Sequence, residues 1–171
     1  MRVIMMLGAV ASAPAMAEVK TASPTGFEIA NAARISVPPE QVYAMLGQPA
    51  RWWNKAHSYS GDSANFTQEL RAGGCFCEAL PADRGSIEHG RVVFAQPGKA
   101  LRLYAALGPL QQEAVTAVLT WSLKPVAGGT EVTQSYVVNG SVRGGADKLA
   151  PIVDRVLAEQ LRGLQAALAK P

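Results

Sequence analysis

The chain has 171 residues, of which 49% are hydrophobic and 17% charged; this fits one folded domain with its own core and excludes a disordered or collagen-like chain. Its net charge of +3 arises from 16 basic and 13 acidic residues. The basic residues are scattered and form no stripe, so nucleic acid is not an expected partner.

The N-terminus carries the pattern of an export signal. Arg2 is followed by a short apolar run over residues 3–10, and Ala15 and Ala17 give the small-x-small spacing of a signal peptidase site. The alternative, a buried N-terminal helix or strand, is disfavoured by Pro14. The apolar run is too short to span a bilayer.

We therefore predict a signal peptide over residues 1–17, with cleavage between Ala17 and Glu18. The mature chain is then periplasmic or secreted and has no integral membrane segment. Residues 18–25 are predicted to form a flexible N-terminus, and residues 26–171 the folded domain.

The elements at the start of the domain follow from alternation and from prolines. A first strand is predicted over residues 26–37, where apolar side chains fall on alternate positions. Pro39 suits the first turn of a helix that ends before Gly47. A second short helix is expected to carry Trp52 and Trp53.

Strand-like runs fill the middle of the chain, separated by short turns rich in glycine and proline. Connections this short favour antiparallel neighbours. The predicted strands cover residues 65–71, 75–80, 86–95, 101–107, 114–125 and 130–139.

The C-terminal segment differs, because its apolar residues recur at helical spacing for about five turns. Asp147 is expected to cap this long helix, which places Pro151 in the first turn, where its missing N–H costs no hydrogen bond. The residues of the apolar face are Leu149, Ile152, Val153, Val156, Leu157, Leu161, Leu164 and Leu168.

This order of elements, β-α-α-β6-α, predicts an α+β fold in which a curved antiparallel sheet of about seven strands wraps around the C-terminal helix. A curled sheet against a helix tends to leave a largely apolar cavity between them. Such a cavity is the default site for a small molecule.

Several short motifs occur in the same order as in a known superfamily. They are Ile-x-Val-Pro-Pro-Glu-x-Val-Tyr over residues 35–43, Pro-x-x-Trp-Trp over 49–53, Leu-Arg-x-Gly-Gly over 70–74, and Gly-Gly-Thr-x-Val-Thr over 128–133. With them, the region 27–168 resembles the START-like or Bet v 1-like (SRPBCC) superfamily, especially its polyketide cyclase-like branch and homologues of the Hsp90 ATPase activator.

The resemblance implies a helix-grip fold whose hydrophobic cavity binds lipids, hormones or polyketides and occasionally supports cyclisation or hydrolysis. Because an exported protein does not meet a cytosolic chaperone, regulation of Hsp90 is not carried over. The resemblance transfers fold better than function.

The first functional hypothesis is therefore an exported protein that binds a small hydrophobic or amphipathic molecule without a cofactor. The candidate ligand-binding residues are Trp53, Tyr104, Trp121 and Tyr136, whose aromatic rings could line the cavity with polar tips inward. At least one of the paired tryptophans 52 and 53 is expected to fill the core instead. The sequence does not predict the oligomeric state.

The second hypothesis is an enzyme of the cyclase or hydrolase type. In it, His89 acts as a general base together with Glu78 or Tyr136, because an imidazole titrates near neutral pH. The other histidine, His57, lies in a polar serine-containing segment that is typical of turns.

The third and weakest hypothesis is a redox or metal-responsive protein built on Cys75 and Cys77. If Leu80 pairs with Ser86, Cys77 faces His89, and both sulfurs share a strand face with that imidazole. Three states then compete: two packed thiols, a disulfide that needs a bulge, or a Zn²⁺ site with His89.

Overall fold

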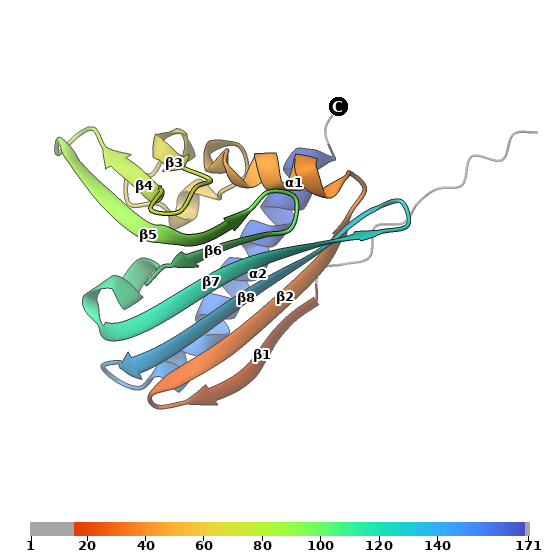
Figure 1. The fold of residues 1–171 in the computed structure, drawn as a ribbon. Helices are drawn as coiled ribbons and strands as arrows, with labels where there is room; N and C mark the ends of the chain where they lie inside the picture. Colours follow the sequence, from red (N-terminus) through yellow and green to blue (C-terminus); the bar gives the residue numbers. More distant parts are fainter. Residues whose placement is uncertain (1–15, 170–171) are drawn as a thin grey trace, which may run out of the picture.

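The computed structural model describes residues 16–169. One eight-stranded antiparallel sheet, in the order β1-β2-β8-β7-β6-β5-β4-β3, curves around the long helix α2, which lies along its concave face (Figure 1). The predicted α+β helix-grip fold is confirmed, with eight strands in place of about seven.

The element bounds are as follows. The strands are β1 (Met16–Ser23), β2 (Gly26–Ile35), β3 (Phe66–Gln68), β4 (Cys75–Leu80), β5 (Gly85–Gln96), β6 (Ala100–Tyr104), β7 (Ala114–Val126) and β8 (Gly129–Ser141). The helices are α1 (Pro39–Leu46), α2 (Ala146–Leu168) and the 3₁₀ turns η1 (Pro49–Arg51), η2 (Lys55–His57), η3 (Ser63–Asn65) and η4 (Gly108–Gln112).

Strand β1 is the additional strand, and it corrects the prediction of a flexible segment over residues 18–25. It pairs antiparallel with β2 from Ser23 opposite Gly26 to Met16 opposite Ala32. The tight turn between the two strands lets the chain cover the free edge of β2. Residues 1–15 lie outside the described part of the chain, so most of the predicted signal peptide does too.

Two shorter elements also differ from the prediction. The expected second helix is wrong, because Trp52 and Trp53 lie between two short 3₁₀ turns, η1 and η2. The strand predicted over residues 101–107 ends at Tyr104, and η4 follows. Both regions border the cavity described below.

The core lies between the concave face of the sheet and α2. Alternate residues of each central strand face the helix and are buried, as the period of two requires. Gly163 lets α2 approach the loop after η1, since a Cβ there would stand 2.3 Å from the Trp52 carbonyl oxygen. The largest apolar core residues include Ile29, Leu46, Leu101, Leu103, Trp121, Tyr136, Leu157, Leu161 and Leu164.

Helix α2 begins one residue earlier than expected and is capped differently. Gly145, with a φ of 97°, occupies the N-cap and no side chain caps the helix, so the predicted cap by Asp147 is wrong. Pro151 therefore lies beyond the first turn, where the Asp147 carbonyl loses its usual intrahelical donor. Among residues 16–169, no helix is both long enough and apolar enough to cross a membrane.

Candidate functional site

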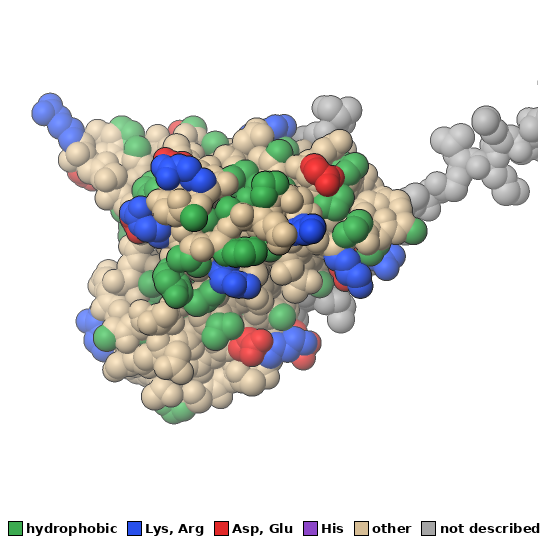
Figure 2. Space-filling model, viewed as in Figure 1, with side chains coloured by type: hydrophobic (Ala, Val, Ile, Leu, Met, Phe, Trp, Pro, Cys, Tyr) green, Lys and Arg blue, Asp and Glu red, His purple; other side chains and the backbone are tan. Residues whose placement is uncertain are grey.

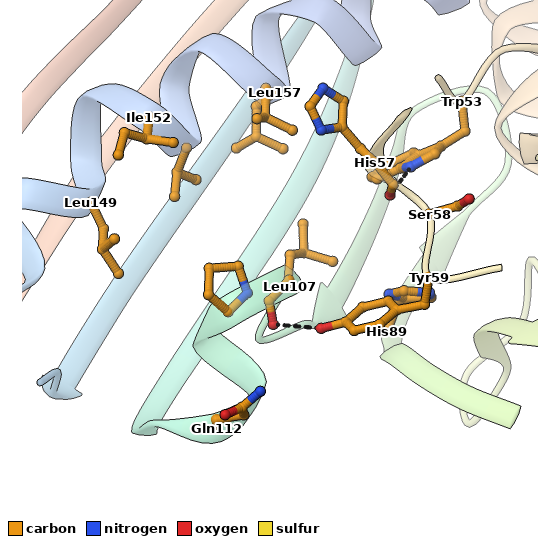
Figure 3. Close-up of a pocket in the computed structure, with 14 residues that line it drawn as sticks. Trp53, His57, Ser58, Tyr59, His89, Leu107, Gln112, Leu149, Ile152 and Leu157 are labelled. Carbon is orange, nitrogen blue, oxygen red and sulfur yellow. Dashed lines mark hydrogen bonds between the residues drawn. The ribbon is translucent and has the colours of Figure 1, made fainter. Parts of the chain in front are cut away.

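A cavity of about 460 Å³ lies between α2, η4 and the loop that follows η1 (Figure 3). We call it the α2 cavity. Helix α2 supplies one apolar wall, and the segment around η4 closes the base. Residues of these two walls are Leu149, Ile152, Val153, Val156, Leu157, Leu107, Gly108, Pro109 and Gln112.

The facing wall is more polar, because His57, Ser58 and Tyr59 project from a single loop (Figure 3). We call residues 54–60 the strap. Trp53 lies directly before the strap, and its indole N–H donates to the His57 carbonyl oxygen at 3.0 Å.

Three hydrogen bonds connect the strap to α2. The backbone N–H of Asn54 donates to Gln160 Oε1 at 2.8 Å, and the Asn54 side chain donates to Glu159. His57 Nε2 lies 2.9 Å from Glu159 Oε2. The hydrogen bonds from His57 and then Asn54 lower the pKa of Glu159, so this carboxylate stays ionised beside the cavity at neutral pH.

The strap is also fastened to η4 and to the sheet. The Tyr59 hydroxyl donates to the Gly108 carbonyl oxygen at 3.1 Å, across the cavity (Figure 3). The backbone N–H groups of Tyr59 and Ser60 donate to the Glu78 carboxylate at 3.2 and 2.5 Å. The polar wall is thus held in place by bonds to three different elements.

Glu78 and His89 form a buried pair behind the strap. His89 Nε2 lies 2.8 Å from Glu78 Oε2, and the two side chains are only 4% and 0% exposed. Burial raises the pKa of Glu78, but the hydrogen bonds from Ser60, Tyr59 and His89 outweigh it, so the pKa lies below its ordinary value. Burial lowers the pKa of His89, and the bond to Glu78 opposes that only in part. The pair is therefore a carboxylate and a neutral imidazole at neutral pH.

His89 lies in a β-bulge of β5. Phe76 pairs with Gly90, whereas Cys77 pairs with Glu88, so His89 is the extra residue of β5. The predicted register, with His89 opposite Cys77, is wrong because Leu80 pairs with Gly85 and not with Ser86, which shifts the ladder from the turn to Cys77 by one residue. The imidazole therefore lies on the face away from the cysteines, where it lines the α2 cavity.

Cys75 and Cys77 are joined by a disulfide, one of the three states left open by the sequence. Their Cα atoms stand 5.4 Å apart, closer than the ~6.6 Å between residues two apart in a regular strand. The register shift opposite Cys77 supplies the irregularity that the prediction required. Within residues 16–169, no three side chains are placed to hold a metal ion, so the proposed Zn²⁺ site with His89 does not form there.

Comparisons with known proteins place the chain in a family. The family described as polyketide cyclase / dehydrase and lipid transport matches residues 27–169. The chain belongs to this family. No curated protein matches its sequence.

Solved structures of low sequence identity share the fold of this polyketide cyclase/dehydrase family member. Protein MLL2253 from Mesorhizobium loti has a TM-score of 0.61 at 18% identity, covering 84% of this chain and 97% of its own. A Rhizobium leguminosarum protein has a TM-score of 0.63 at 16% identity, covering 93% and 100%. CalU16 from Micromonospora echinospora has a TM-score of 0.61 at 15% identity, covering 92% and 88%. At these identities the likeness concerns the fold alone.

Of the four aromatic residues predicted to bind ligand in this family member, only Trp53 lines the α2 cavity. Tyr104 is 57% exposed on the sheet face turned away from α2, a face where Figure 2 shows apolar and charged side chains intermingled. Trp121 is buried and meets Trp52 edge-on, with ring centroids 5.8 Å apart. Tyr104 and Trp121 therefore do not line the α2 cavity, in contrast to their prediction as ligand-binding residues.

Tyr136 does not line the α2 cavity either, in contrast to its prediction as a ligand-binding residue. Its hydroxyl donates to the Ala105 carbonyl oxygen at 2.7 Å and accepts from the Leu107 N–H at 3.1 Å. Burial raises the pKa of Tyr136 far above its ordinary value. Both bonds hold the chain between β6 and η4, so this tyrosine shapes the base of the α2 cavity without facing it.

Sequence reasoning missed the strap as a functional element. The serine-containing segment around His57 is typical of turns, and nothing in the sequence singles out Tyr59. The apolar face of α2 is predicted from its helical spacing, but the spacing does not show which part of that face lines the cavity. One signal was available: the family member has only two histidines, and both line the α2 cavity.

The buried pair makes the stability of the protein sensitive to acid. The pKa of His89 in the folded protein lies below its ordinary value of 6.5. Neutral His89 therefore contributes fully to the free energy of unfolding above pH 6.5, and this contribution is lost as the pH falls below that value. Glu78 contributes to the free energy of unfolding at pH values above its ordinary pKa of 4.5. This contribution is lost as the pH falls through the lower pKa of the folded state.

We expect the unfolding free energy to decrease from pH 7 to pH 5, measured by urea denaturation. His89→Gln, which keeps a donor toward Glu78 but does not titrate, should flatten this decrease around pH 6. An equally steep decrease in the variant would contradict the assignment to His89.

Proposed function

We propose that this family member binds a small amphipathic molecule in the α2 cavity. The observation that carries the proposal is the division of the cavity into an apolar wall on α2 and a polar wall on the strap. The apolar body of the ligand would lie against Val153 and Val156, and its polar end against His57 and His89. A volume of about 460 Å³ falls within the usual range for small-molecule sites.

The α2 cavity also has an apolar margin. Ile152 is 55% exposed although it belongs to the apolar face of α2, and Pro109 is exposed on the opposite side. Exposed apolar side chains at the margin of a pocket gain burial when a ligand occupies it. Affinity would come mainly from this burial, at ~25 cal/mol per Å² before the costs of binding.

The test is a titration with 11-(dansylamino)undecanoic acid, a fluorescent molecule with an apolar chain and a carboxylate. Val156→Trp fills part of the α2 cavity and should weaken binding at least tenfold, since removing ~60 Å² of apolar contact is enough. Val137→Trp is the matched control, because Val137 is 43% exposed on the opposite sheet face. Equal affinity of the two variants would contradict the proposal.

We further propose that the protein acts in the periplasm or outside the cell. The Cys75–Cys77 disulfide supports this, because disulfides persist mainly in oxidising compartments. The predicted cleavage would remove only Met16 and Ala17 from β1 and leave the rest of its pairing with β2. Protein isolated from the exporting host should begin at Glu18 on N-terminal sequencing. A chain that still begins at Met1 would refute the prediction.

A further inference from the structure

We propose that the α2 cavity is also a site of proton transfer, in which the imidazole of His89 acts as a general base on an amphipathic substrate with a weakly acidic C–H bond. The inference rests on the proposed function, because the substrate must first bind in the cavity. It goes beyond binding by assigning a chemical step to one side chain.

The hydrogen bonding of His89 decides which nitrogen is the base. Its Nε2 meets the Glu78 carboxylate, which only accepts hydrogen bonds, so Nε2 carries the ring proton. The lone pair of the neutral ring is then on Nδ1. Nδ1 makes no hydrogen bond to any group within residues 16–169. It is also absent from the fully buried polar atoms of this range that have no hydrogen-bond partner, so it is not closed off from the cavity. Since the ring lines the α2 cavity, Nδ1 is the atom available to a ligand.

The ring is also held in position. It packs among Phe66, Phe76 and Tyr59, with ring centroids 5.1, 5.2 and 5.9 Å away. Glu78 is itself fixed by the backbone N–H of Tyr59, from the strap. A base held on one axis by a carboxylate and on its faces by aromatic rings needs little reorganisation before it reacts.

Glu78 has a second consequence for the reaction. When Nδ1 takes up a proton, the imidazolium is stabilised by the adjacent carboxylate. The C–H electron pair stays on the substrate, either as a carbanion beside an electron-withdrawing group or as a new bond while a leaving group departs. Proton transfer from a carbon atom is slow without a catalyst, whereas O–H and N–H protons exchange rapidly. A positioned base therefore accelerates the reactions of carbon acids most.

The probe for this activity is 5-nitro-1,2-benzisoxazole, an apolar carbon acid. Its C3–H proton passes to Nδ1, the C–H electron pair becomes the third bond of a nitrile, and the N–O bond breaks. The oxygen leaves as a coloured phenolate, whose absorbance measures the reaction. The product is an isomer of the probe, so the reaction needs no oxidant or reductant. The bound proton returns to water.

We expect wild-type protein to accelerate this elimination with a rate that rises through an apparent pKa below the ordinary histidine value. His89→Gln keeps a donor toward Glu78 but offers no base, and should lower kcat/KM at least 100-fold. Glu69→Gln, a change of an exposed side chain outside the α2 cavity, should leave kcat/KM unchanged.

Two further variants test the roles of the pair. His89→Ala should regain part of its rate when free imidazole is added, which a purely structural role would not give. Glu78→Gln should move the apparent pKa of the rate lower, because the carboxylate is what raises the pKa of His89. The other titratable groups that line the cavity, His57 and Tyr59, remain in every variant.

The inference is overturned if wild-type protein is no faster than free imidazole at equal concentration, or if His89→Gln is as fast as wild type. The same proteins are titrated with 11-(dansylamino)undecanoic acid. Retained affinity without acceleration refutes the base alone, whereas wild-type protein that fails to bind refutes the proposed function.

Discussion

Leu161→Ala is expected to lower the free energy of unfolding by about 2–5 kcal/mol, measured by urea denaturation at neutral pH. Leu161 is 0% exposed and belongs to the hydrophobic core between α2 and the sheet. Truncation removes buried apolar surface and leaves a cavity that the surrounding strands fill only in part. The size of the loss therefore reports how firmly the sheet holds the helix.

Ile152→Ala is the control on the same helix. It deletes a side chain of similar size, but one that is 55% exposed, so the expected loss is within ~0.5 kcal/mol. Similar losses in the two variants would mean that α2 does not lie against the sheet as described. In that case the α2 cavity would not have the walls assigned to it.

Glu78→Gln is expected to cost about 1–3 kcal/mol of unfolding free energy and to loosen the strap. The carboxylate accepts hydrogen bonds from the backbone of Tyr59 and Ser60 and from His89. A glutamine has one acceptor oxygen and presents an N–H₂ group to a donor, so at least one buried group loses its partner. Hydrogen exchange at the Tyr59 and Ser60 amides should become faster.

Glu69→Gln provides the comparison for this change. Glu69 is exposed and its ion pair with Arg71 lies at the surface, where such pairs contribute little. Its expected cost is within ~0.5 kcal/mol, with no change in exchange of the strap. An unchanged exchange rate in Glu78→Gln would show that the strap is held mainly by α2 and η4.

The fold could be predicted from the sequence because its main signals are local and periodic. Alternation located β7 and β8, and helical spacing located α2 within one or two residues of its observed ends. Strand β1 could not be predicted from alternation, because Glu18 and Lys20 flank only one apolar side chain, Val19. Its pairing depends on the free edge of β2, which no local pattern records.

The candidate site was harder to predict, since its residues come together through irregular backbone. Because Leu80 pairs with Gly85 and not with Ser86, His89 lies on the strand face of Glu78 and not on that of the cysteines, and no local sequence pattern fixes this one-residue difference. Tyr104 alternates with the buried Leu101 and Leu103 and so faces away from α2, whereas Tyr136 faces inward with its hydroxyl bonded to the backbone. His57 reaches the cavity only because the strap crosses to Glu159 on α2, 102 positions away in the chain.

The most direct test of the account is an NMR titration of methyl-labelled protein with 11-(dansylamino)undecanoic acid. We expect saturable shifts at the methyl groups of Leu107, Val153 and Val156, which line the α2 cavity. Val93 and Val137, which are exposed on the sheet, should not shift. Shifts centred on the two exposed valines, or no saturable shifts at the cavity methyl groups, would contradict a ligand site between the strap and α2.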